Sequence, residues 1–328
     1  MSGLTRGIAI GFHVPVGRTW AQAMAADLHG TSGFYGRGRG PDRDFRTAST
    51  LAPDLLADAL VRLLGRMPLA ARQQVVEIGA GTGALLAALA ERLPEQVLLV
   101  GVEQRPRPTT LPTRVQWRVE LPATVTGLLL AFEWLDTVPV DVVRDGRVLQ
   151  VGADGVEQPG PPPSEAQRRW LQRWWPDGSR REVGADRDAA WADAVARLER
   201  GLAVAVDYGH VRAERPEGGS LTGYRDGRLV APAADGATDV TAAVAWDAVL
   251  DAVGRRCPGA TSALLPQGRA LRDLGVSAAL PPRNAIDAPA LARVSRARLL
   301  LDPGGLGGFG WAVTAVRTDP PFPSPEAS

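Results

Sequence analysis

The chain has little cysteine, little histidine and no lysine. Its one cysteine among 328 residues, Cys257, cannot form an internal disulfide, so we expect a reducing compartment, the cytoplasm. The histidines His13, His29 and His210 are scattered and have no cysteine pairs beside them, which leaves too few ligands for a zinc site. A chain of this length can bury a sizeable hydrophobic core, so the sequence predicts a fold without disulfides or a structural metal.

A strong net charge and long apolar runs are also missing. The 37 arginines nearly balance 36 acidic residues, and the net charge of +1 does not indicate a nucleic-acid or membrane-surface partner. No apolar run approaches the roughly 20 residues that a membrane-spanning helix needs. The short apolar stretch 7–12 has no small-residue cleavage site after it, so we expect it to belong to the mature protein.

Short β-prone runs alternate with helical spacing through much of the chain. The runs expected to be strands are 75–78, 97–102, 115–119, 127–132, 202–206 and 310–316. Residues 84–93 are strong helix formers, so we expect a helix after the first strand. The run 127–132 is almost wholly apolar, as expected for a strand buried on both faces. This alternation predicts an α/β fold with a parallel, doubly wound sheet.

Other segments flank or interrupt the alternation. Ser49 or Thr50 is expected to cap a helix over 51–63, with Pro53 in its first turn, and helical spacing returns over 240–253. A hairpin over 142–149 precedes a tryptophan-rich amphipathic helix. We therefore expect five parts: an N-terminal arm (1–50), the first part of the core (51–143), a helical insertion or cap (144–196), the completed core with a polar substrate loop (197–317) and a disordered tail (318–328).

The run Glu77-Ile78-Gly79-Ala80-Gly81-Thr82-Gly83 is the strongest local motif, because a strand ends in a glycine turn and a helix follows. Glycines suit a turn with positive φ against which a ligand presses. Glu103, at the end of the next strand, can accept hydrogen bonds from both hydroxyls of a ribose. The predicted cofactor-binding residues are Glu77, Gly79, Ala80, Gly81, Thr82, Gly83, Glu103 and Gln104.

Two cofactors fit this loop. Gly79 and Gly81 followed by Ala84 also meet a looser dinucleotide pattern, so a nicotinamide-dependent oxidoreductase is one interpretation. Glu77, two residues before the first glycine, and the long segment that precedes the loop favour S-adenosylmethionine.

Further motifs occur in series over most of residues 30–317. They are Gly33-Phe34-Tyr35 followed by Asp44-Phe45-Arg46-Thr47-Ala48, Phe132-Glu133-Trp134-Leu135-Asp136-Thr137-Val138-Pro139-Val140, Asp207-Tyr208-Gly209, Gly219-Ser220-Leu221-Thr222-Gly223-Tyr224, and Asp239-Val240-Thr241 with Val244 and Trp246. In this order they resemble the MidA-like methyltransferases, a family that includes the mitochondrial assembly factor that methylates an arginine of a respiratory complex I subunit.

The resemblance implies a Rossmann-like class I methyltransferase sheet with an N-terminal helical arm and inserted cap segments. It also implies S-adenosylmethionine as cofactor and protein arginine N-methylation. The chain departs from the family pattern at Phe132, where the family has Asn, at Gly223, where it has Arg, and in the glycine loop. A catalytically inactive, cofactor-binding assembly factor is therefore the alternative to an active enzyme.

Three acidic residues follow the fourth and fifth predicted strands: Glu133, Asp136 and Asp207. They fall at the carboxyl edge of the sheet, where open α/β sheets bind their ligands. Methyl transfer from a sulfonium is an in-line displacement that depends mainly on positioning. For the guanidinium that the resemblance implies, carboxylates would orient the acceptor and offset its charge. We expect Glu133 to be the main acceptor-orienting group, Asp136 and Asp207 to support it, and a protein to be the substrate.

Overall fold

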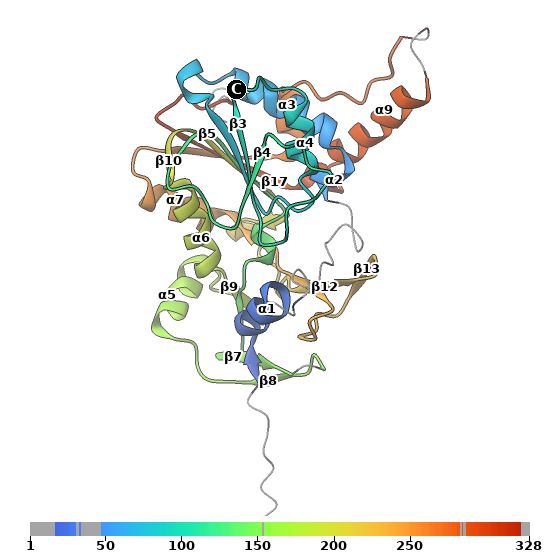
Figure 1. Ribbon diagram of the computed structural model, residues 1–328. Coiled ribbons are helices and arrows are strands. Elements are labelled where there is room, and N and C mark those ends of the chain that lie inside the picture. The colour runs from blue at the N-terminus through green and yellow to red at the C-terminus, as the bar shows by residue number, and fades with distance from the viewer. Residues whose placement is uncertain are drawn as a thin grey trace, which may run out of the picture.

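The structure is a computed structural model that describes residues 17–30, 33, 47–152, 154–282, 284 and 287–322. It has a large lobe built on a central sheet and a smaller lobe that contains α1, β7, β8 and β9 (Figure 1). The motif residues Phe34, Tyr35 and 44–46 lie outside the described residues, as do most of the predicted arm and the end of the tail.

Seven strands form the central sheet. They are β2 (Gln74–Ile78), β3 (Leu98–Val102), β4 (Val115–Arg118), β5 (Val125–Phe132), β10 (Leu198–Asp207), β16 (Thr261–Pro266) and β17 (Gly310–Val316). Their order is β16-β17-β10-β5-β2-β3-β4, and the five strands from β10 to β4 pair in parallel. The predicted Rossmann-like sheet is thus confirmed. It is mixed rather than wholly parallel, because β17 is antiparallel to both β10 and β16.

Helices cover both faces of this sheet. One face packs against α3 (Pro53–Gly65), α4 (Ala84–Ala90), α8 (Gln267–Asp273) and α9 (Ala288–Leu301), and the other packs against α6 (Ala185–Val195) and α7 (Trp246–Arg256). Alternate side chains of a strand point to opposite faces. Along β10, Leu202 and Val204 accordingly join the first core, whereas Ala203 and Ala205 join the second.

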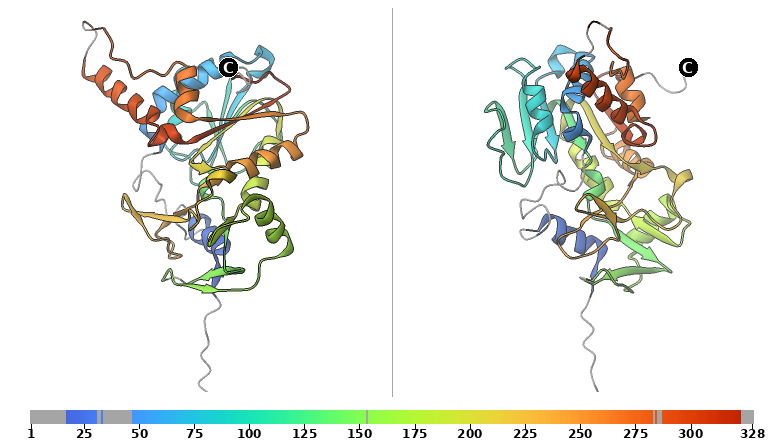
Figure 2. Two further views of the ribbon diagram at one scale, coloured as in Figure 1. Left: turned by 180° about the vertical axis from the view of Figure 1, so that it is seen from behind. Right: turned by 90° about the vertical axis from the view of Figure 1, so that its right-hand side faces the viewer.

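The smaller lobe combines segments that are far apart in the sequence (Figure 2). Its strands are β1 (Arg18–Thr19), β6 (Asp141–Arg144), β7 (Arg147–Val151), β8 (Glu157–Pro159) and β9 (Arg180–Val183) in one sheet, and β12 (Thr222–Arg225), β13 (Arg228–Val230) and β14 (Asp239–Thr241) in another; its helices are α1 (Trp20–His29) and α5 (Glu165–Trp174). Trp20 and Met24 of α1 share a core with Leu149 and Ala234. The arm, the insertion and the substrate loop therefore pack together.

Four expectations about boundaries need correction. The predicted insertion 144–196 is not mainly helical, and its last part is α6, whose fully buried Trp191 packs against the central sheet. This helix directly precedes β10 and packs on the sheet, so it belongs to the core. The helix expected over 240–253 begins only at Trp246, because the residues before it form β14 and the short strand β15 (Val244–Ala245), which pairs with β11 (Gly209–His210).

The predicted helix over 51–63 is divided in two. Thr47, not Ser49 or Thr50, caps the short helix α2 (Ala48–Leu51), and α3 begins at Pro53 without a side-chain cap. The start of the tail is ordered as well, because Phe322 is buried and Arg66 donates a hydrogen bond to the carbonyl of Pro321. Residues 323–328 lie outside the described residues.

No helix among the described residues is long and apolar enough to cross a membrane. Within the same residues, no group of three or more His, Cys, Asp or Glu side chains is arranged to hold a metal ion.

Candidate active site

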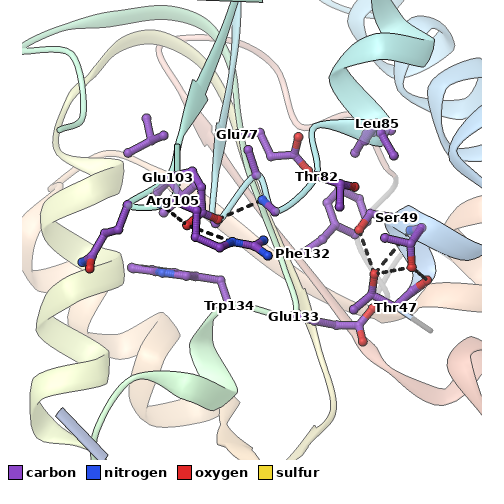
Figure 3. Close-up of a pocket in the computed structure, with 18 of the residues that line it drawn as sticks. Thr47, Ser49, Glu77, Thr82, Leu85, Glu103, Arg105, Phe132, Glu133 and Trp134 are labelled. Atoms are coloured by element: carbon purple, nitrogen blue, oxygen red, sulfur yellow. Dashed lines mark hydrogen bonds and ion pairs between the residues drawn. The ribbon is translucent and has the colours of Figure 1, made fainter. Parts of the chain in front are cut away.

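A pocket of about 310 Å³ lies at the carboxyl ends of β2, β3 and β5 (Figure 3). This volume is at the lower end of the roughly 300–1,000 Å³ that small-molecule sites occupy. The pocket lies where the chain changes direction across the sheet, since β2 has β3 on one side and β5 on the other. Open α/β sheets bind ligands at this switch point. The predicted cofactor residues that line it are Glu77, Gly79, Ala80, Gly81, Thr82, Glu103 and Gln104.

The glycine loop has the backbone that the sequence predicts. Gly79, Gly81 and Gly83 have φ values of 66°, 58° and 73°, a region that side chains disfavour. A Cβ at Gly79 would lie 2.9 Å from Cδ1 of Trp134, so this turn has no room for a larger residue. Gly83 is the one predicted cofactor residue that does not line the pocket. It starts α4 in the left-handed conformation and lies against Leu111.

Glu103 connects the glycine loop to the segment after β3. One carboxylate oxygen accepts the N–H of Gly81 at 3.0 Å, and the other accepts the N–H of Arg105 at 3.0 Å. The carboxylate is therefore fixed beside the exposed loop backbone, with lone pairs remaining for further donors. This position suits the two hydroxyls of a ribose.

Glu77 is almost completely buried behind the glycine loop and lines the pocket. Burial, with a smaller contribution from the charge of Glu103, raises the pKa of Glu77 to about 8. Its Oε2 atom has no hydrogen-bond partner among the described residues. Since buried polar atoms are normally paired, this oxygen fits a ligand that brings a donor, such as the amino-acid end of S-adenosylmethionine.

Glu133 follows β5 and also lines the pocket. Its φ of 48° is unusual for a residue with a side chain and is a mark of local strain. The backbone N–H donates to the carbonyl of Val206, and Oε1 accepts the N–H of Ala48 at 2.6 Å. Burial raises the pKa of Glu133 to about 8; the bond from Ala48 lowers it and the charge of Asp136 raises it further.

Asp136 and Asp207 lie together but do not line the pocket. Asp207 accepts the N–H groups of Asp136 and Tyr208 at 3.1 and 3.0 Å, so it holds the turn that follows Glu133. Burial raises the pKa of Asp136 to about 6 against the opposing effect of Arg187. Burial and the charges of Asp136 and Glu133 raise the pKa of Asp207 well above its usual value. The structure groups the three predicted acids, and their catalytic roles stay predictions.

Other pocket residues were not predicted as site residues. Thr47, Ser49 and Thr50 form a hydroxyl-rich wall on α2, and Arg105 and Trp134 lie beside the glycine loop. The only signals for the hydroxyl residues were a helix cap and a family motif, neither of which indicates a pocket. Nothing local in the sequence brings α2 next to Glu133, because 85 positions separate Ala48 from it.

A family model described as S-adenosyl-L-methionine-dependent methyltransferase matches residues 55–261. The matched range includes the glycine loop, Glu103 and the three predicted catalytic acids. The methyltransferase family that the motifs indicated is thereby confirmed. The interpretation of the loop as part of a nicotinamide-dependent oxidoreductase is set aside. None of the curated proteins matches the chain.

Two solved structures from Burkholderia thailandensis resemble the whole chain. One was crystallised with S-adenosyl-homocysteine bound; it superposes with a TM-score of 0.78 at 24% identity, over 93% of this chain and 89% of that one. The other is a native structure of a protein of the same superfamily, with a TM-score of 0.77 at 24% identity and the same coverage. At this identity the two structures show that the chain shares their fold. The coverage means that the shared fold includes nearly all of the chain.

Proposed function

The chain belongs to this S-adenosyl-L-methionine-dependent methyltransferase family, and on that premise we propose that its methyl acceptor is an arginine guanidinium of a protein substrate. The observation that carries the proposal is the group of acids beside the cofactor pocket. Glu133 lines the pocket, and Asp136 and Asp207 lie next to each other outside its lining. The predicted resemblance to MidA-like enzymes supports the same acceptor.

A cationic acceptor fits the charges of this region. Arg187 lies among the acids, but its guanidinium donates to the backbone carbonyls of Ala243, Asp136 and Val138. No carboxylate of the three therefore has an ion-pair partner among the described residues. A guanidinium that entered beside Glu133 would favour the ionised form of this carboxyl and form two parallel hydrogen bonds with it.

The protein's part in the reaction is positioning. S-adenosylmethionine, when bound, supplies a methyl group on a sulfonium, and its transfer is an in-line displacement. The glycine loop and Glu103 hold the cofactor at the switch point, while Glu133 orients the acceptor nitrogen toward the same pocket. The acceptor nitrogen releases one N–H proton to solvent when it gains the methyl group, so the guanidinium retains a single positive charge, which Glu133 offsets.

Transfer of a tritiated methyl group from labelled cofactor into lysate proteins, followed by detection of methylarginine, tests the proposal. Glu133→Gln should abolish most of the transfer, whereas Glu91→Gln, at a residue with a 77% exposed side chain on the far end of α4, should leave it unchanged. Unchanged transfer in Glu133→Gln, or label only on another residue type, would contradict the proposed role.

A thermal-shift measurement shows whether the protein binds the cofactor product, and together with the labelled-methyl assay it separates an active enzyme from an inactive cofactor-binding factor. S-adenosylhomocysteine should raise the melting temperature and NAD(H) should not, because only a ligand that binds the folded state stabilises it. Stabilisation without any methyl transfer would support the inactive assembly factor instead.

A further inference from the structure

The carboxylate of Glu133 is held by a segment that comes before the methyltransferase core in the chain. The N–H of Ala48, at the start of α2, donates to Oε1 at 2.6 Å. Figure 3 shows Thr47, Ser49 and Glu133 side by side at one wall of the pocket. Because the backbone of Glu133 is also tied to Val206, both ends of this residue are fixed.

The donor itself is rigidly placed. The Thr47 hydroxyl caps α2 by accepting the N–H of Thr50 at 3.3 Å, and it lies 3.1 Å from Ser49 Oγ and 2.9 Å from Thr50 Oγ1. Ala48 is fully buried in the core that α3 and the central sheet share. The N–H of Ala48 therefore cannot turn away from Glu133 without disturbing this packing.

The charge of Asp136, on the same turn, raises the pKa of Glu133. The charge of Glu133 in turn raises the pKa of Asp207, at the end of β10, and of Tyr224, on β12. Arg187 is the nearby cation, and it acts on Asp136 and Asp207. For Glu133 itself, the bond from Ala48 is the interaction that favours the ionised form. Without it, a buried carboxyl among other acids would take up a proton more readily.

We propose that the Thr47–Ala48 segment is a positioning element of the reaction, in which the N–H of Ala48 holds Glu133 against the pocket and keeps it able to carry the negative charge that receives a cationic acceptor. This inference rests on the proposed role of Glu133. It assigns the N-terminal segment a part in the chemistry, rather than in stability alone.

Ala48→Pro tests the inference because it removes the donor itself. Ala48 is the first residue of α2, where proline is tolerated, and Thr47 already has the extended backbone (φ −73°, ψ 160°) that a following proline requires. Ala288→Pro is the matched control, since Ala288 is the first residue of α9 after an extended Asp287 and does not line the pocket.

The readout is the titration of Glu133, followed by NMR on protein with ¹³C-labelled glutamate and assigned with Glu133→Gln. Loss of a hydrogen bond to a charged group should raise the pKa of Glu133 from about 8 by about one unit or more. The ionised fraction at pH 7, and with it methyl transfer, should fall about tenfold. The affinity for S-adenosylhomocysteine should not change. In a Glu133→Gln background, Ala48→Pro should have no further effect on the pH profile.

Thr47→Val and Thr47→Ser extend the test to variants that keep the backbone donor. Loss of the cap in Thr47→Val should raise the pKa of Glu133 in the same direction, and Thr47→Ser should restore it. If Ala48→Pro does not fold, the Glu133 titrations of Thr47→Val and Thr47→Ser are sufficient to test the inference. An unchanged Glu133 titration in folded Ala48→Pro or Thr47→Val would overturn the inference. Because the titration needs no acceptor, it stands apart from the arginine proposal, which the labelled-methyl assay tests.

Discussion

Replacing Glu77 by glutamine should make the protein more stable, and by an amount that grows with pH. The folded protein keeps the proton of Glu77 up to about pH 8, whereas the unfolded chain releases it near 4.5. The folded state therefore binds more protons between these values, so this group lowers the free energy of unfolding as the pH rises. Below about pH 4.5 both states are protonated, and the effect is absent.

The size of the effect follows from the shift. Each pKa unit corresponds to about 1.4 kcal/mol, so the difference between 4.5 and about 8 amounts to at most roughly 5 kcal/mol when both states are ionised. Glutamine has nearly the same shape and no charge. The stability gained by Glu77→Gln over the wild type should thus rise by about 1.4 kcal/mol per pH unit between pH 5 and 8.

Urea denaturation of both proteins at pH 5, 6, 7 and 8 measures this gain, and Glu91→Gln serves as the exposed control. Other buried acids, Glu133 among them, also make the wild type less stable at high pH, but they affect both proteins equally and cancel in the difference. A gain that does not depend on pH would refute the argument that burial holds Glu77 neutral. Calorimetric titration with S-adenosylhomocysteine adds a separate result, because weaker binding by the variant would place Glu77 in contact with the cofactor.

Three further substitutions test other parts of the structure. Gly83→Ala should destabilise the protein by about 2–4 kcal/mol in urea denaturation. The φ of 73° at this position strains a residue with a side chain, and a Cβ would lie 2.7 Å from Leu111 Cδ1. A loss below about 1 kcal/mol would contradict this packing. Glu103→Gln should weaken S-adenosylhomocysteine binding about ten- to a hundredfold in calorimetry, since hydrogen bonds to a charged acceptor are lost, and unchanged affinity would remove Glu103 from the site. Trp191→Ala should cost about 3–5 kcal/mol of stability, because the fully buried indole fills the space between α6 and the sheet; a small loss would favour α6 as part of the insertion.

The elements that were predicted correctly have local causes. The glycine loop is read from the residues themselves, because alternate glycines after an apolar strand permit the positive φ values found at Gly79, Gly81 and Gly83. The central strands are likewise visible as short apolar runs. Their boundaries shifted by a few residues, since hydrogen bonding to neighbouring strands decides where each strand ends.

The errors arose where distant segments meet. Nothing in the spacing of Trp20 and Met24 indicates that α1 packs with residues of β6 and β14 to form a second core. The tail residue Phe322 looked disordered in a proline-rich context, yet it is buried and lies under the guanidinium of Arg66. Contacts of this kind depend on which surfaces the fold brings together, and composition does not encode them locally.

The sequence alone determined the kind of ligand. A strand, a glycine turn and an acid after the next strand are the pattern of a site for a nucleoside-containing cofactor. This pattern can be read from the sequence because the backbone geometry of the turn and the order of the strands follow from local residues. Only the tertiary structure decided the charge of that site. Glu133 is an ordinary carboxyl by sequence, and its raised pKa comes from burial, from Asp136 and from a backbone N–H of a helix 85 positions earlier. Electrostatic energies depend on distance through space and on exclusion of water, which appear only when the chain has folded.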